Sequence, residues 1–226
     1  MFAILKTRLT QDLSYINVFR EKNPNNQYVF EKFEFNQDDT VFVDAGAFDG
    51  DTAELFFDNF PNFKKGILFE PNPINRENIN KRFYVKEKEI EVYSKGLSNE
   101  KKSLEITINH SASTVEKGQY NTSIHNKEIV ELIALDKVLN EKVSFIKMDI
   151  EGSELDAING CKFTIKSQTP NLAICVYHRL SDLWDIPLKI LEINPNYEFY
   201  LRHYSGNNHS LYETVLYAVR KKTVQF

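Results

Sequence analysis

Cysteine is scarce in this sequence of 226 residues, which contains only Cys161 and Cys175. Neither belongs to a C-x-x-C pair or to another spacing typical of zinc ligands, so the sequence predicts no metal cluster. Two isolated cysteines in a chain of this size are typical of a reducing compartment. The composition therefore favours a cytoplasmic protein.

Long apolar runs and an excess of basic residues are also missing. Residues 1–9 carry Lys6 and Arg8 but no long apolar stretch, so we expect neither a signal peptide nor a membrane span. The formal net charge of −4 argues against non-specific nucleic-acid binding, although it leaves a specific RNA substrate open. The pattern G-x-x-x-x-G-K-[ST] is absent, which excludes a phosphate-binding P-loop.

The segment Val41–Thr52 has the pattern of a buried strand, a glycine-rich turn and the start of a helix. Its first three residues are apolar without alternation, as in a strand covered on both faces. Gly46 and Gly50 lack a Cβ atom, so the backbone can turn sharply and a ligand can approach it. Asp51 suits the N-cap of the helix, with Glu54 as its partner in a capping box. Amides at this helix start can hold a carboxylate.

Two acids flank the glycine turn. Glu70 ends the next predicted strand, where a carboxylate accepts hydrogen bonds from the cis-diol of a ribose. Asp44 suits a cationic amino-acid group better than a pyrophosphate, which it would repel. Dinucleotide enzymes prefer G-x-G-x-x-G, whereas Phe48 stands two residues after Gly46. These features favour S-adenosylmethionine over NAD, and a tight turn without a ligand is the alternative.

Two acids, Asp149 and Glu151, stand at the end of a second apolar segment, residues 143–150. The carboxyl ends of central strands line the ligand crevice of a doubly wound sheet, so we expect these acids near Asp44 and Glu70. Four acids at one edge repel each other and need compensating cations or hydrogen-bond donors. The sulfonium and amino groups of the cofactor would supply this positive charge, and so would a divalent cation. For Glu151, a simple preference for the helix N-terminus is the alternative role.

His178 follows another apolar strand, predicted over residues 172–176. A histidine at this edge of the sheet can take a proton from a substrate hydroxyl near neutral pH. A structural histidine that binds a loop carbonyl is the alternative. The candidate catalytic residues are therefore Asp149, His178 and Glu151.

Apolar periodicity predicts an alternation of strands and helices along the chain. Strands are expected over residues 41–44, 66–70, 90–93, 104–108, 129–134, 143–150, 172–176, 198–203 and 214–219, and helices over 52–59, 74–83, 154–158 and 183–192. The last two strands are joined by a short connection that contains Gly206, which predicts an antiparallel hairpin. We expect an α/β protein with the Rossmann-like class I methyltransferase fold: a seven-stranded, mostly parallel sheet with a C-terminal antiparallel hairpin.

The first part of the chain is predicted to be separate from this sheet. The apolar residues that recur at spacings of three and four, and so predict an amphipathic helix, are Leu5, Leu9, Leu13, Ile16 and Phe19. We assign residues 1–36 to an N-terminal helical cap and residues 37–226 to a class I methyltransferase domain. Such a segment covers either one end of the fold or the site, and we favour the first.

Four segments together resemble the FkbM family of methyltransferases. They are Val43–Thr52, Phe69–Pro73, Ile146–Glu154 and Tyr177–Arg179, and the resemblance extends over about residues 38 to 220. It implies an S-adenosylmethionine-dependent enzyme that methylates a hydroxyl oxygen, on sugars of glycans or on polyketide-type products. The cofactor-binding residues predicted from the turn and the resemblance are Asp44, Gly46, Ala47, Gly50, Asp51, Thr52, Glu70, Pro71, Leu97 and Asp149.

The sequence is compatible with three functions. The first is an S-adenosylmethionine-dependent O-methyltransferase that acts on a small-molecule or glycan acceptor, with Asp149 or His178 as the base. The second is an NAD-linked oxidoreductase with Glu70 on the ribose and His178 as proton donor. The third is a non-catalytic protein that uses the same fold to bind a glycan or a partner chain. We assign no metal ligand and leave a divalent cation open, together with the oligomeric state.

Overall fold

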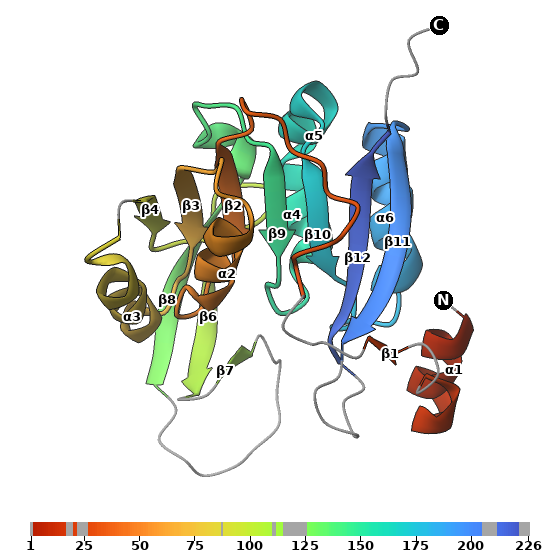
Figure 1. Ribbon diagram of the computed structural model, residues 1–226. Coiled ribbons are helices and arrows are strands. Elements are labelled where there is room, and N and C mark those ends of the chain that lie inside the picture. The colour runs from red at the N-terminus through yellow and green to blue at the C-terminus, as the bar shows by residue number, and fades with distance from the viewer. Residues whose placement is uncertain are drawn as a thin grey trace, which may run out of the picture.

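The computed structural model of the protein describes residues 2–16, 20–21, 27–86, 88–109, 112–114, 126–204 and 212–221. These residues form a twisted sheet with helices on both faces and a smaller sheet at one end (Figure 1). Within the described residues, no helix has both the length and the apolar character that a bilayer crossing requires.

The main sheet has the predicted seven strands and one short addition. In spatial order they are β1 (Arg20–Glu21), β11 (Tyr197–Tyr204), β12 (Thr214–Arg220), β10 (Asn171–Cys175), β9 (Phe145–Met148), β2 (Val41–Ala45), β3 (Lys65–Phe69) and β4 (Glu89–Tyr93). β12 runs antiparallel to β10 and β11, and the other pairs are parallel. The C-terminal antiparallel hairpin is therefore confirmed, although Gly206 in its connection lies outside the described residues.

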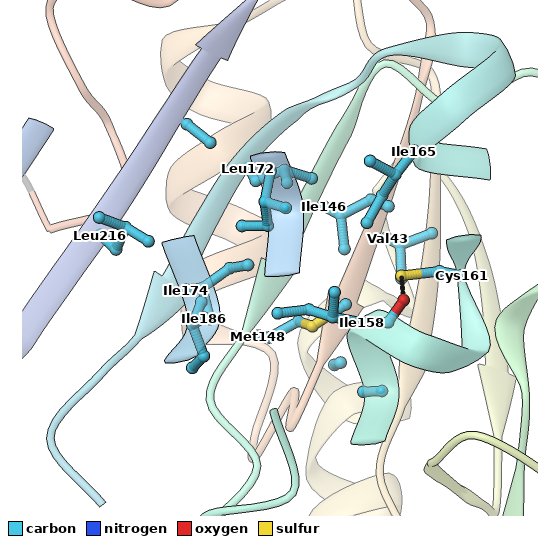
Figure 2. Close-up of a cluster of buried hydrophobic side chains, with 14 of the residues drawn as sticks. Val43, Ile146, Met148, Ile158, Cys161, Ile165, Leu172, Ile174, Ile186 and Leu216 are labelled. Carbon is cyan, nitrogen blue, oxygen red and sulfur yellow. Dashed lines mark hydrogen bonds between the residues drawn. The ribbon is translucent and has the colours of Figure 1, made fainter. Parts of the chain in front are cut away.

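Apolar side chains cover both faces of this sheet. Helices α4 (Glu154–Gly160), α5 (Lys162–Gln168) and α6 (Asp182–Ile193) pack on one face. Figure 2 shows that Val43 and Ile146 of neighbouring strands lie near Ile158 and Ile165, and that Ile174 lies beside Ile186. The described short helix α5 has no counterpart among the helices predicted from the sequence.

The opposite face is unusually aromatic. It is covered by α2 (Asp51–Asn59), α3 (Pro73–Phe83) and the irregular segment of residues 28–35. Phe56 of α2 stacks on Phe145 of β9 with ring centroids 4.3 Å apart, and Phe30 stacks on Tyr217 of β12 at the same distance. Such ring pairs add to the free energy gained by burying apolar surface. The aromatic core thus holds residues 28–35 against the sheet.

The N-terminal helix is shorter than the sequence predicts. α1 spans Phe2–Thr10, and a single 3₁₀ turn, η1, follows at Leu13–Tyr15. The helix ends because Gln11 adopts a left-handed φ of 57° and the Asp12 carboxylate then caps η1 by accepting from Ser14 N–H at 2.9 Å. Phe19, the last residue of the predicted helix, lies outside the described residues.

A smaller sheet adjoins the carboxyl edge of the main one (Figure 1). It contains β5 (Gly96–Leu97), β8 (Asn126–Ile133), β6 (Lys102–Asn109) and β7 (Ala112–Thr114), in that order. The strands predicted over 104–108 and 129–134 are confirmed. They form an antiparallel pair with each other, and this pair does not belong to the main sheet.

Candidate functional site

A cavity of about 530 Å³ opens where β2, β3 and β9 end. Its volume lies within the range of about 300–1,000 Å³ that is usual for small-molecule sites. Its position at the carboxyl ends of parallel strands is where doubly wound folds bind ligands. The predicted site residues that line it are Gly46, Asp51, Thr52, Glu70, Pro71, Leu97, Asp149 and Glu151.

The glycine turn forms the floor of this cavity. Gly46 has a φ of 74°, and a Cβ atom there would lie 1.9 Å from the Asp149 carbonyl oxygen, so no side chain fits. Gly50 has a φ of 86° and is itself the N-cap of α2, which makes Asp51 the first helical residue. Glu54 forms an ion pair with Arg82. The predicted Asp51–Glu54 capping box is therefore wrong, because the left-handed glycine already occupies the cap position.

Glu70 is the best-supported cofactor ligand. Its side chain is buried, and the two carboxylate oxygens accept from the backbone N–H groups of Phe48 at 2.9 Å and Asn72 at 2.8 Å. Burial raises the pKa of this carboxyl, and the two backbone donors oppose the shift. Each oxygen has a second lone pair for a ligand hydroxyl. This geometry fits the cis-diol of a ribose in the cavity.

Asp44 does not line the cavity, contrary to its predicted contact with the cofactor. Its carboxylate lies 3.0 Å from the ammonium of Lys147, and the two side chains are 1% and 4% exposed. Lys147 also donates to the Gly46 carbonyl at 2.7 Å. The pair forms because Asp44 and Lys147 are register partners on β2 and β9. Asp44 therefore anchors Lys147 beneath the turn, and the positively charged Lys147 lines the cavity in its place.

Two more predicted cofactor residues lie outside the cavity lining. Ala47 is buried in the aromatic core cluster, and the Cα of Gly50 faces Phe83 of α3, whose ring would lie 3.0 Å from an added Cβ atom. Their roles are therefore to shape the turn. The sequence analysis gave Lys147 no role, although a lysine inside the apolar run 143–150, two residues before Asp149, was an available signal.

Asp149 lines the cavity directly after β9. Its Oδ2 accepts from the Tyr28 hydroxyl at 3.2 Å and its Oδ1 from the Tyr177 hydroxyl at 3.0 Å. Burial raises the pKa of both phenols, so both are neutral hydrogen-bond donors at neutral pH. Two donors from distant segments fix the orientation of the carboxylate at the cavity wall.

His178 is a cation in this structure. Its Nδ1 lies 3.0 Å from Glu154 Oε1, and its Nε2 lies 3.4 Å from Glu151 Oε2 and 3.6 Å from Asp149 Oδ1. Burial lowers the pKa of the imidazole, but the carboxylates of Glu151 and Glu154 raise it by more than burial lowers it. The resulting pKa is about 10. The raised pKa favours a protonated His178 at neutral pH, which disfavours it as a base there, and its catalytic role stays a prediction.

The compensating charge expected among the clustered acids is thus present in side chains. Lys147 offsets Asp44, and His178 offsets the carboxylates around it. Asp149, Glu154 and His178 do offer ligand atoms within 4.8 Å of one another. However, the same nitrogens and oxygens already pair as an imidazolium with carboxylates. A divalent cation stays a prediction.

The small sheet supplies an apolar wall to the cavity. Leu97 follows β4 and is almost completely buried, and Leu104, Val130 and Leu132 of β6 and β8 lie beside it in the lining. A flat apolar wall of this kind suits an adenine ring. Three further lining residues, Gln27, Tyr28 and Glu213, had been given no role from the sequence, because they come from segments far from the glycine turn.

The strand order, with β12 antiparallel between β10 and β11, and the glycine turn followed by Glu70 define the class I S-adenosylmethionine-dependent methyltransferase fold. A family model described as the methyltransferase FkbM domain matches residues 44–213. The chain therefore belongs to the FkbM methyltransferase family, and the resemblance seen in the sequence is confirmed.

Comparisons with known proteins agree with this assignment. The crystal structure of the methyltransferase FkbM from Methylobacillus flagellatus KT matches with a TM-score of 0.76 and 26% identity, over 96% of this chain and 53% of that chain. This chain thus spans about half the length of that protein. Aeropyrum pernix fibrillarin, solved with natively bound S-adenosyl-L-methionine, shares the fold with a TM-score of 0.53 and 11% identity, over 85% of this chain and 72% of that chain. No curated protein matches the sequence.

Proposed function

We propose that this chain transfers a methyl group from S-adenosylmethionine to a hydroxyl oxygen of a small-molecule or glycan acceptor. The observation that carries the proposal is the placement of Glu70 and Asp149 on one cavity. The Glu70 carboxylate, after β3, is oriented by two backbone N–H groups, and Asp149 is held at the end of β9, with β2 between the two strands. Family membership gives the reaction class, and the hydroxyl acceptor is our own proposal.

The residues of the cavity fit the ribose and the adenine of the cofactor. Glu70 would accept from the ribose hydroxyls, and the wall around Leu97 would pack on the adenine. The N–H groups of Asp51 and Thr52 at the start of α2 already donate to the side chains of Asp49 and Asp51, so they are not free for the carboxylate of the methionine part. When bound, S-adenosylmethionine supplies an electrophilic methyl group on a sulfonium. Lys147, already paired with Asp44, keeps the turn beneath this site in place.

Asp149 is the base in this proposal. Its carboxylate lines the cavity, and Tyr28 and Tyr177 hold it in one orientation. It accepts the proton of the acceptor hydroxyl, while His178 stays protonated behind it and stabilises the negative charge. Glu151 also lines the cavity and is the second candidate for this role. Because a general base contributes about 10²–10⁴-fold, the rest of the acceleration comes from holding the two reactants in line.

Cofactor binding is the first test. We expect S-adenosylhomocysteine, measured by calorimetric titration, to saturate the protein and NADH to give no binding heat. Glu70→Ala should weaken the binding at least tenfold, because two ribose hydroxyls lose their acceptor. A hydrogen bond to a charged group contributes about 1.5–3 kcal/mol. Glu77→Ala, an exposed change on α3, is the matched control. Binding of NADH alone would establish the oxidoreductase instead.

Catalysis is the second test. Asp149→Asn should reduce methyl transfer at least a hundredfold while S-adenosylhomocysteine still binds, because the amide cannot take up a proton. Acceptors are screened with radiolabelled S-adenosylmethionine, with neutral and amine-bearing sugars first. Full turnover in the Asn variant contradicts the role of Asp149. Tight cofactor binding without transfer to any acceptor favours the non-catalytic alternative.

The predicted cytoplasmic location is part of the same proposal. Both cysteines are free and buried, as is usual for a protein of a reducing compartment.

A further inference from the structure

Backbone strain is concentrated around the cavity. Six described residues other than glycine have a positive φ, and four of them line the cavity: Tyr28 at 71°, Phe48 at 49°, Glu151 at 55° and Glu213 at 64°. A residue with a Cβ atom adopts this conformation at a cost in free energy, and such residues cluster at ligand sites. Phe48 is explained by the glycine turn and by its N–H bond to Glu70. The other three surround Asp149 and belong to no part of the cofactor cradle.

A chain of hydrogen bonds connects two of these strained residues, Tyr28 and Glu213, with Asp149. Gln27 Nε2 donates to Glu213 Oε2 at 2.9 Å and to the Tyr28 hydroxyl at 3.1 Å, and Tyr28 donates to Asp149 Oδ2 at 3.2 Å. Gln27 and Tyr28 come from the N-terminal segment, whereas Glu213 directly precedes β12. Segments almost 190 residues apart in the sequence therefore form one wall beside the proposed base.

This wall is strongly acidic. Within the described residues, five carboxylates line the cavity, and Asp51 and Glu70 among them belong to the cofactor cradle. The remaining three, Asp149, Glu151 and Glu213, face the space beside it. Cations close to this wall are Lys147, which is paired with the buried Asp44, His178, which is shared between Glu151, Glu154 and Asp149, and Arg179, whose Nε would lie 3.3 Å from a Cβ atom added at Gly152. Burial raises the pKa of Glu213, whereas the Gln27 amide, His178 and Lys147 oppose this shift. The carboxylates around the wall outnumber these cations.

We propose that Gln27, Tyr28, Glu151 and Glu213 form the acceptor subsite, and that its acidic wall selects a neutral or amine-bearing hydroxyl compound over an anionic one. Gln27 and the carboxylates offer hydrogen-bond acceptors for hydroxyl and ammonium groups. A uronic acid or a sugar phosphate would be repelled at this wall. The inference rests on the proposed methyl transfer and adds the charge class of its acceptor.

The test uses two cofactor analogues, so it needs no identified acceptor. Sinefungin carries a protonated amine at the position of the sulfonium and its methyl group, whereas S-adenosylhomocysteine is neutral there. We expect calorimetric titration to show sinefungin binding at least about tenfold more tightly, because its amine meets the acidic wall. Glu213→Gln should reduce this preference about threefold or more, and Glu151→Gln should act in the same direction. Glu77→Gln on the exposed face of α3 should leave it unchanged.

The outcomes separate the two proposals. Equal affinity for the analogues in the unaltered protein, or a preference that neither Glu213→Gln nor Glu151→Gln changes, overturns the acidic acceptor subsite. Failure of both analogues to bind overturns the proposed function itself. Thermal unfolding of each variant shows whether the wall is still folded, and Glu151→Gln provides the result if Glu213→Gln does not fold. Methylation of glucuronate in preference to glucosamine would also refute the subsite.

Discussion

Lys147→Met removes the buried cation beneath the glycine turn. Methionine has a similar length and no polar head, so it fills the same space while the carboxylate of Asp44 loses its partner at 3.0 Å. Gly46 also loses the ammonium that donates to its carbonyl. Because Asp44 is 1% exposed, water cannot replace that partner. The variant therefore places an unpaired carboxylate in the core.

The size of the effect follows from the proton that Asp44 must then bind. Burial already raises the pKa of Asp44, and Lys147 is the main opposing influence. Without Lys147 the carboxyl is protonated in the folded state, and this costs about 1.4 kcal/mol for each pH unit above its ordinary value of about 3.9. The loss in the free energy of unfolding is therefore at most about 4 kcal/mol at about pH 7 and at most about 1.5 kcal/mol at about pH 5, because the pKa of Asp44 is already raised in the unaltered protein. It lies within the range of about 3–5 kcal/mol for breaking buried ion pairs.

Urea unfolding followed by circular dichroism at these two pH values measures the effect. Stability is retained below the ordinary pKa of Asp44 and lost as the pH rises through its raised value, so the deficit must grow with pH. The double variant Asp44→Asn/Lys147→Met carries no charge at either of these two buried positions. It should therefore lose the pH dependence of the deficit. Lys162→Met, at an exposed position of α5, is the control for lysine removal. A Lys147→Met deficit below about 1 kcal/mol, or one that is equal at both pH values, would refute the buried ion pair.

Two further predictions follow from the same site. The pKa of His178 is raised to about 10. Its contribution to stability is therefore complete below about pH 6.5 and is lost as the pH rises towards about 10. The upper limit of this contribution to the free energy of unfolding is about 5 kcal/mol. Thermal unfolding between about pH 7 and 10 should show this loss in the unaltered protein and much less of it in His178→Gln, whereas parallel curves would contradict the charged imidazole. Gly46→Ala should destabilise the protein by more than about 3 kcal/mol, because its Cβ would overlap the Asp149 carbonyl at 1.9 Å. Lys101→Ala, at an exposed position before β6, offers a comparison, and equal melting temperatures for the two variants would argue against the close contact.

Local sequence patterns were sufficient for the order of the main-sheet strands from β2 to β12, whereas the short elements β1, β5, β7 and α5 were not predicted. Apolar runs such as residues 172–176 predict buried strands wherever they lie in the chain, because the burial of both faces leaves no alternation. The glycine turn and Glu70 were also recognisable from the sequence, because a sharp turn and a strand-terminal acid occupy neighbouring parts of one βαβ unit. The prediction was poorer at the N-terminus, where one left-handed residue, Gln11, ended a helix that the periodicity continued.

The sequence by itself therefore determined the strand and helix order, the class of fold, and the place of Gly46, Glu70 and Asp149 at one edge of the sheet. These features depend on residues close together in the chain or on the topology of a parallel sheet. Only the tertiary structure decided the charge states and the partners. Lys147 pairs with Asp44 through strand register, His178 is protonated because three carboxylates surround it, and Glu213 reaches Gln27 across most of the chain length. Burial and distance set these properties, and neither is encoded in the local sequence.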